Sequence, residues 1–244
     1  MMDSDWLCAI ESDDTIRLGF CLTRGISRDH IERMIAERRQ KSFADIPDLL
    51  KRVPFQQDEL RILAKAGALN PLAGHRRDAL WLVEGKFHQD ELFSEQRSEA
   101  SSPLAPMEPL ERLEADFETM RLTTGPHPMA YLRESLPSDV WRSTDLTLAE
   151  NGARLRVSGI AICRQRPGTA KGFVFISLED ETGISNIIVH PEIFERNRFV
   201  ITQETFLLIE GILQARSGTI HVRAEKIERL PTFDLETARS HDFQ

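Results

Sequence analysis

The segment GFVFISLEDETGISNIIVHPEIFERNRF, residues 172–199, decides the fold of the second half of the chain. Its two apolar stretches, GFVFISLED and ISNIIVH, have the composition of β-strands joined by a tight turn. Pro191 then begins a predicted helix, because proline fits the first turn of a helix. Three further strands are predicted around this segment, with the sequences RLRVSGIAICR, TFLLIEGILQ and TIHVRAEKIERL.

Five strands with a helix between the third and the fourth follow the order of the OB-fold barrel. Gly159 and Gly211 lie inside predicted strands, where they fit the bends that a small closed barrel needs. We therefore predict an α+β, multi-domain chain. Its five-stranded OB-fold β-barrel occupies residues 150–231, and a C-terminal tail follows over residues 232–244.

Short helices dominate the first part of the chain. Apolar residues recur at helical spacing in SRDHIERMIAERR, where Ser27 suits the N-cap, and in QQDELRILAKAG, which ends at Gly67. Pro47 suits the start of a further helix between them. The residues predicted to face the core of these helices are Ile31, Met34, Ile35, Leu60, Leu63 and Ala64.

Two glycine turns, LTRGISRDH and KAGALNPLAGHRR, predict a tandem helix-hairpin-helix domain over residues 16–86, after an N-terminal extension of residues 1–15. In such a hairpin, backbone N–H groups of the turn and of the next helix hold a DNA phosphate. The predicted contacts are Arg24, Gly25, Ser27, His75, Arg76 and Arg77. The last three open a helix, where bases oppose the helix dipole unless an anion is present. A plain helical bundle, whose glycines only end helices, is the alternative.

Charge is distributed unevenly along an acidic chain of 244 residues with a net charge of −8. Residues 15–41 hold seven bases and three acids, whereas residues 88–118 hold nine acids and two bases. We expect residues 87–149 to form an acidic, proline-containing linker with connector helices, and the flanks to meet polyanions. Three scattered cysteines, a start without signal-peptide features and the lack of a long apolar run predict a cytoplasmic protein.

The loop RQRPGTAKG, residues 164–172, joins the first two predicted strands of the barrel. OB-folds grip single strands with this loop and with the face of strands two and three. Arg164, Arg166 and Lys171 are therefore predicted to neutralise phosphates, and Phe173 and Phe175 to stack on bases. Strand parity alone leaves open whether the two phenylalanines or their apolar neighbours form the core. A solvated hairpin tip remains the alternative for the basic loop.

QDELF, residues 89–93, follows the helical part and could dock in an apolar groove through Gln89, Leu92 and Phe93. An ordinary amphipathic turn explains the same residues. Catalytic motifs such as a phosphate-binding Walker loop, HExxH or GxSxG do not occur in the sequence. Asp180 and Glu181 are adjacent in a predicted turn and do not form a joint metal site. We therefore assign no catalytic residue, no metal site and no cofactor to this chain.

Several stretches together resemble the C-terminal region of bacterial error-prone DNA polymerases of the replicative C family. They are IRLGFCLTRGI, LAKAGALNPLAGHRRDALW, SPLAPMEPLERLEADF, GPHPMAYLR and RQRPGTAKGFVFISLEDETG, in this order. The resemblance implies tandem helix-hairpin-helix elements, a connector and an OB domain. It also implies a role in DNA repair and in damage-induced (SOS) translesion synthesis, with a sliding clamp and accessory proteins as partners and QDELF in the place of a clamp-binding peptide.

The family's catalytic domains, including the palm that binds the polymerase Mg²⁺ ions, lie upstream of this region. The resemblance therefore implies a DNA-binding portion, for single-stranded or primer-template DNA, without catalysis of its own. Two other interpretations stay open. The chain could serve an active polymerase whose catalytic domains are encoded separately, or it could be a module that binds clamp or polymerase and hardly touches DNA.

Overall fold

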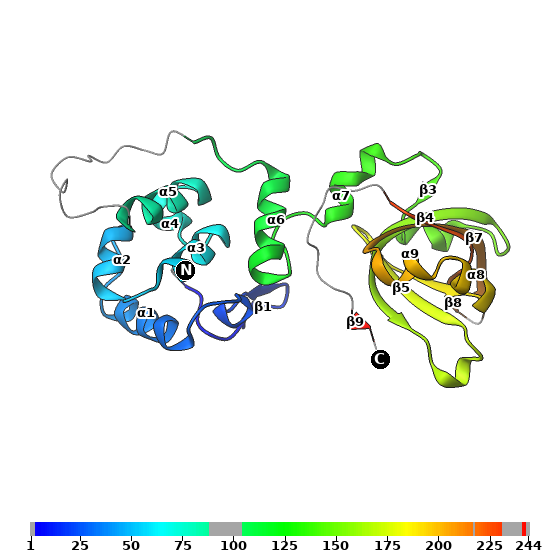
Figure 1. Cartoon of the computed structure of the whole chain (residues 1–244), viewed down its shortest axis with the longest axis horizontal. Helices are drawn as coiled ribbons and strands as arrows, with labels where there is room; N and C mark the ends of the chain where they lie inside the picture. Colours follow the sequence, from blue (N-terminus) through cyan, green and yellow to red (C-terminus); the bar gives the residue numbers. More distant parts are fainter. Residues whose placement is uncertain (1–2, 88–103, 217, 231–240, 243–244) are drawn as a thin grey trace. The chain divides into compact units, whose positions relative to one another are not determined.

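The computed structural model describes residues 3–87, 104–216, 218–230 and 241–242. These residues form two compact units, Met1–Thr123 (unit 1) and Thr124–Gln244 (unit 2), which are described separately (Figure 1). The boundary falls inside the predicted connector, residues 87–149. Its described part before Thr124, residues 104–123, belongs to unit 1, and its part after Thr123 belongs to unit 2.

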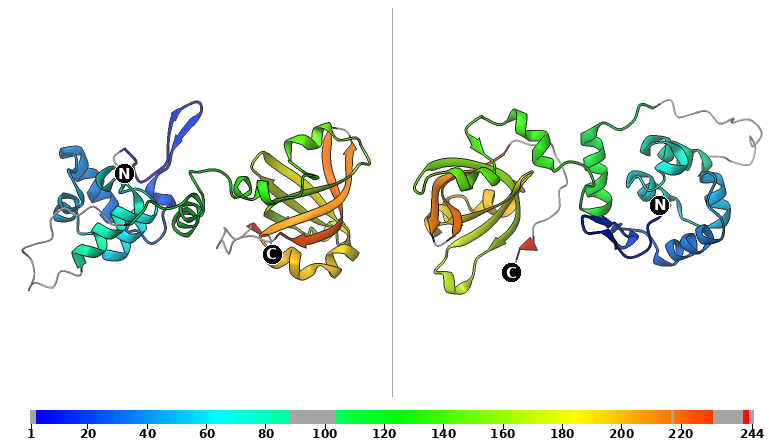
Figure 2. Two further views of the ribbon diagram at one scale, coloured as in Figure 1. Left: turned by 90° about the horizontal axis from the view of Figure 1, so that it is seen from above. Right: turned by 180° about the vertical axis from the view of Figure 1, so that it is seen from behind.

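Unit 1 consists of short helices and one hairpin. The hairpin of β1 (Ala9–Ser12) and β2 (Thr15–Arg17) projects from the helices (Figure 2). The helical elements that follow are η1 (Phe20–Leu22), α1 (Arg28–Gln40), α2 (Ile46–Arg52), α3 (Gln57–Lys65), α4 (Asn70–Ala73), α5 (Arg76–Phe87) and α6 (Pro109–Met120). The predicted helices that contain Pro47 and end near Gly67 are confirmed.

The core of unit 1 contains both predicted apolar faces. Ile31 and Met34 of α1 and Leu60 and Leu63 of α3 are fully buried in one cluster. The prediction for Ser27 is confirmed in position only. Ser27 is the N-cap of α1, but its side chain makes no cap hydrogen bond within the described residues. Its backbone N–H donates to the carboxylate of Glu59 instead.

Unit 2 is a closed barrel with short helices attached. Before the barrel come α7 (Pro128–Leu132), η3 (Arg133–Ser135), β3 (Val140–Trp141) and η4 (Thr144–Leu148). The barrel elements are β4 (Arg154–Gln165), η5 (Gly168–Ala170), β5 (Val174–Asp180), β6 (Gly183–Val189), α8 (Pro191–Arg196), α9 (Arg198–Gln203), β7 (Phe206–Arg216) and β8 (Thr219–Arg229). The short strand β9 (His241–Asp242) pairs with β4.

The strand order β4-β5-β6-β8-β7 closes on itself because β4 also pairs with β7. The β6–β8 pair is parallel and the other pairs of the ring are antiparallel. The five predicted strands and the helical segment between the third and fourth are therefore confirmed. That segment consists of two short helices, α8 and α9, because the helical conformation is interrupted at Asn197. Both lie at one end of the barrel (Figure 2).

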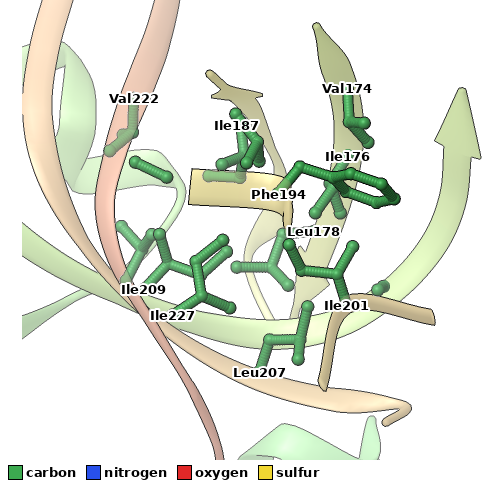
Figure 3. Packing of buried hydrophobic residues seen from close by; sticks show 14 of the residues in the cluster. Val174, Ile176, Leu178, Ile187, Phe194, Ile201, Leu207, Ile209, Val222 and Ile227 are labelled. Carbon is green, nitrogen blue, oxygen red and sulfur yellow. The ribbon is translucent and has the colours of Figure 1, made fainter. Parts of the chain in front are cut away.

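The barrel interior settles which face of β5 is buried. Val174, Ile176 and Leu178 point inward and are at most 2% exposed, and Phe194 and Ile201 of the two helices join the same cluster (Figure 3). Since side chains alternate along a strand, Phe175 points outward, with an exposed fraction of 37%. Phe173 precedes the strand and is half-buried.

Gly159 and Gly211 lie where neighbouring backbones approach closely. A Cβ atom on Gly159 would lie 2.4 Å from the carbonyl oxygen of Glu179, and one on Gly211 would lie 2.3 Å from that of Arg223. Both residues are predicted from the sequence to permit bends. In the structure, their role is to leave room for the backbone of the adjacent strand.

Candidate nucleic-acid interface

The outward face of the barrel carries a row of four side chains on four neighbouring strands. Gln165 of β4 lies opposite Phe175 of β5, Phe175 lies opposite Ile188 of β6, and Ile188 lies opposite Arg223 of β8. Gln165, Phe175 and Arg223 are exposed, and Ile188 is half-buried. We call these four residues the barrel row. An aromatic ring beside an aliphatic side chain, with an amide and a guanidinium at the two ends, suits a base and its phosphate.

The loop between β4 and β5 borders this row and is packed against α8. The Arg166 guanidinium lies 4.5 Å from the centroid of the Phe194 ring and 3.3 Å from the Glu195 carboxylate. A Cβ atom on Gly172, which has a φ of +85°, would lie 3.3 Å from Pro191. Phe173 contacts the His190 ring edge to face at 5.1 Å. The loop is therefore fastened to α8 and its N-cap at Arg166, Gly172 and Phe173, although residues 165–169 and Lys171 are exposed to solvent.

Two of the three predicted cations of this loop face solvent. Arg166 keeps 47% of its side chain exposed despite its contacts with α8. Lys171 is exposed in a left-handed backbone conformation, with a φ of +50° and no ion pair among the described residues. Arg166 and Lys171 are therefore the predicted loop cations that a phosphate group can approach from solvent.

Arg164 differs from these two cations. Its Cα partner on β5 is the buried residue Ile176, and its guanidinium donates a hydrogen bond to the carbonyl oxygen of Glu204, just before β7. It is half-buried. The structure thus gives Arg164 a role in joining β4 to the segment that precedes β7, away from its two predicted companions.

In unit 1 the first glycine turn carries an internal carboxylate. Gly25 has a φ of +76°, and the backbone N–H of the exposed residue Arg24 donates to the carbonyl oxygen of Thr119 at 2.9 Å. The backbone N–H of Ser27, at the start of α1, donates to Oε1 of Glu59 at 2.8 Å. Glu59 therefore accepts the Ser27 N–H, one of the backbone donors that the sequence prediction assigned to a phosphate.

Glu59 is held by three donors although it is only 5% exposed. Besides the Ser27 N–H, the Gln56 N–H lies 2.8 Å from Oε2, and Nδ1 of His30 lies 2.7 Å from the same oxygen. Burial by itself raises the pKa of this carboxyl. The hydrogen bonds from Gln56, Ser27 and His30 outweigh it, so the pKa of Glu59 is lowered.

The bases at the start of α5 face carboxylates of α6. Arg76 pairs with Asp116 at 2.7 Å, and the two side chains are 10% and 3% exposed. Arg77 pairs with Glu111, which also lies on α6. His75 lies 2.9 Å from Asp78, within its own turn. Asp116 and Glu111, which lie 40 and 34 residues after their partners in the sequence, and Asp78 offset the unfavourable position of the bases at a helix N-terminus.

The acidic turn Asp180–Glu181 is also engaged within unit 2. Asp180 accepts hydrogen bonds from the N–H groups of Ser143 and Thr182, each at 2.8 Å, and Glu181 pairs with Arg133 at 2.7 Å. Burial raises the pKa of Asp180, but the hydrogen bonds from Thr182 and Ser143 lower it further than burial raises it. Among the described residues, no group of three or more His, Cys, Asp and Glu side chains could hold a metal ion.

Gln89, Leu92 and Phe93 lie outside the described residues, so the clamp-binding segment stays a prediction. Arg223 and Ile188, in contrast, are site residues that sequence reasoning missed. Alternation along the last strand does predict that the side chain of Arg223 points to the face opposite to Val222 and Ala224. Its position beside Ile188 follows only from the closure of the barrel. Among the helices that the structure describes, none has the length and apolar composition of a membrane span.

Two family models match the two units separately. Residues 1–79 match a helix-hairpin-helix motif, and residues 155–230 match an OB-fold nucleic acid binding domain. With the closed barrel and the barrel row on its outer face, these matches define the chain as a nucleic-acid-binding protein.

Nearly the whole chain is homologous to the C-terminal part of error-prone DNA polymerases, as its resemblance to this family predicts. It is 38% identical over 252 residues to the enzyme of Pseudomonas savastanoi pv. phaseolicola, which covers 99% of this chain and 24% of the relative. The enzyme of Aromatoleum aromaticum is 34% identical over 258 residues, with coverages of 99% and 24%. The chain thus spans about a quarter of the length of the curated relatives it matches.

Similar solved structures cover part of the chain. An asparaginyl-tRNA synthetase from Pyrococcus horikoshii complexed with asparaginyl-adenylate is 20% identical, with a TM-score of 0.34, over 40% of this chain and 23% of that one. An OBody, AM1L10, bound to hen egg-white lysozyme is 15% identical, with a TM-score of 0.32, over 40% of this chain and 98% of that one.

Proposed function

We propose that this chain holds single-stranded DNA, or the template strand of a primer-template, during error-prone synthesis across DNA lesions. The barrel row together with Arg166 and Lys171 supports this proposal most directly. It combines an exposed aromatic ring with cations beside it, the combination that proteins use to bind single strands without sequence preference. The homology to error-prone DNA polymerases supplies the process in which such binding would act.

Within this proposal, the chemistry of synthesis belongs to residues outside this chain. The chain corresponds to about a quarter of its relatives, and its conspicuous buried carboxylates, Glu59, Asp116 and Asp180, are all engaged in hydrogen bonds or ion pairs. The magnesium ions of synthesis would accompany the catalytic domains. A sliding clamp, bound through QDELF, and translesion accessory proteins are proposed as further partners.

The basic loop is proposed to contribute phosphate contacts, so removing its solvent-facing cations should flatten the salt dependence of binding. The slope of log K against log salt concentration is negative, and each phosphate contact with a single strand adds about 0.7 to its magnitude. The double variant Arg166→Ala/Lys171→Ala should therefore reduce the magnitude of the slope by about 1.4. Binding of fluorescent oligothymidylate to the whole chain, titrated at several salt concentrations, measures this slope.

Arg156→Ala provides the matched control. Arg156 lies on the β3–β4–β7 side of the barrel and pairs with Asp139 at 3.0 Å. Its removal should leave the slope unchanged. An unaltered slope in the loop variant would exclude the loop as a phosphate contact. A parent chain that binds no single strand at any salt concentration would exclude the proposed function itself.

Phe175→Ala should weaken the binding of all oligonucleotides alike and leave the salt slope unchanged, because stacking involves no counterion release. The expected loss is about 1–3 kcal/mol of binding free energy. Protein stability should be retained, since the ring is on the outer face.

Ile176→Ala, one residue further along the same strand, is the comparison. It creates a cavity in the core and should lower the free energy of unfolding by about 2–5 kcal/mol. Melting curves and titrations of both variants separate the two faces, and a large stability loss in Phe175→Ala would contradict this assignment.

A further inference from the structure

The helical pair α8–α9, between the third and fourth strands of the barrel, carries an aromatic side chain that the fold does not use. Phe199 is 72% exposed, whereas Phe175 in the barrel row is 37% exposed. The other apolar positions of the pair do pack inward, with Phe194 at 6% and Ile201 at 1% exposure. The position of Phe199 in α9 therefore directs a whole ring into water while its neighbours cap the barrel end.

Two arginines precede this residue at the junction of α8 and α9. Arg196 ends α8, Arg198 begins α9, and both are exposed. Neither forms an ion pair with a carboxylate in the described part of unit 2, whereas Arg166, Arg223 and Arg229 each do. The acids of the same segment are Glu192 and Glu195, and Glu195 faces the loop through Arg166. The junction of α8 and α9, residues 196–198, is thus locally positive.

The same helical pair is continuous with the basic loop. Arg166 stacks on Phe194 and pairs with Glu195, and Gly172 lies against Pro191, so the loop and α8 form one surface. A strand that leaves the barrel row over Arg166 and Lys171 meets α8 next. We call Arg196, Arg198 and Phe199 the helical platform.

We infer that the helical platform is a second contact site for single-stranded DNA, in which Phe199 stacks on a base and Arg196 and Arg198 bind the adjoining phosphates. An exposed aromatic residue next to cations in the chain fits unpaired nucleotides, because every base has a π-face and every linkage a negative charge. The inference rests on the proposed function, since the helical platform would extend the path of a strand that is already bound by the barrel.

The test uses the whole chain and an oligothymidylate of about 20 nucleotides, which exceeds the site size of about 4–16 nucleotides per OB-fold. Phe199→Ala should weaken binding by roughly 5- to 150-fold, the equivalent of one lost stacking contact. Arg196→Gln/Arg198→Gln should lower the salt slope by about 1.4. Phe199→Trp should restore the affinity, and its additional fluorescence should be quenched when the oligonucleotide binds.

Leu148→Ala is the matched control, because Leu148 is an exposed apolar side chain of η4 in the same unit, at 79% exposure. It should bind like the parent. If Phe199→Ala and the double arginine variant both bind the oligonucleotide as the parent does, the helical platform is not a DNA contact. That result is distinct from failure of the proposed function, in which the parent chain itself would not bind. Since all the changed side chains are exposed, unchanged melting temperatures will show that the variants are folded.

Discussion

Replacing Gly211 with alanine is expected to unfold the barrel of unit 2 or to destabilise it by at least about 3 kcal/mol, at the upper end of the usual cost of overpacking. The added Cβ atom would lie 2.3 Å from the carbonyl oxygen of Arg223 and 2.9 Å from its carbonyl carbon. Backbone atoms of a paired strand cannot rotate away as a side chain can. The strands β7 and β8 would have to separate at this point, next to the core residues Leu213 and Val222.

Amide hydrogen exchange of the whole chain measures this effect strand by strand, and denaturant titration measures the loss of free energy. Gly168→Ala is the control within the same unit. A Cβ atom there meets nothing within 4 Å, so the change should alter stability by no more than about 0.5 kcal/mol. A Gly211→Ala barrel as protected from exchange as the parent would mean that the β7–β8 pair accommodates the added Cβ atom without opening, which would contradict this prediction.

Replacing Glu59 with glutamine should lower the free energy of unfolding of unit 1 by about 3 kcal/mol, because charged hydrogen bonds and buried donors are lost together. Two backbone N–H groups, those of Ser27 and Gln56, converge on this carboxylate with His30. A neutral amide can accept at one atom only, and its NH₂ group would oppose one of these donors. Urea unfolding followed by far-UV circular dichroism measures the loss.

The same carboxylate should make unit 1 sensitive to acid. Because the pKa of Glu59 is lower in the folded chain than its ordinary value of 4.5, its contribution is fully present above that value. The contribution is lost as the pH falls through the lowered pKa. The difference in unfolding free energy between the parent and Glu59→Gln should therefore shrink as the pH is lowered below 4.5. Glu32→Gln removes an exposed pair with Arg28 and should show a far smaller difference at every pH. A constant difference for Glu59→Gln down to strong acid would contradict this account.

Local pattern was sufficient for the five barrel strands, for several helices and for much of the core, but it did not predict the β1–β2 hairpin or β3. Helical spacing identified Ile31 and Leu60 as buried, and alternation together with one helix identified the barrel. The pattern could not choose between the two faces of β5. Both faces are apolar near its start, where Phe173 and Phe175 alternate with Val174 and Ile176. The closure of the barrel makes that choice.

The site residues were harder to predict because their roles depend on distant partners. Arg76 and Arg77 are predicted as phosphate ligands, and the structure pairs them with Asp116 and Glu111 of α6. The sequence within one helical turn of the two arginines does not indicate that Asp116 and Glu111 are their partners. The same holds for Arg223, which joins Phe175 and Ile188 only through the parallel β6–β8 pair. Arg166 and Lys171 could be placed from sequence because a loop of known position in the barrel keeps them together.

The anchoring of the β4–β5 loop on α8 has a consequence for the thermodynamics of association. Arg166, Gly172 and Phe173 fasten the loop to Phe194, Pro191 and His190 as the barrel folds. The loop's conformational entropy is therefore lost before any ligand arrives. Binding a strand then requires little further ordering of the protein, and preorganisation of this kind strengthens affinity without adding a contact. Calorimetry should accordingly find that the entropy lost on binding comes mostly from the nucleic acid, whose flexible backbone becomes ordered on a surface already in place.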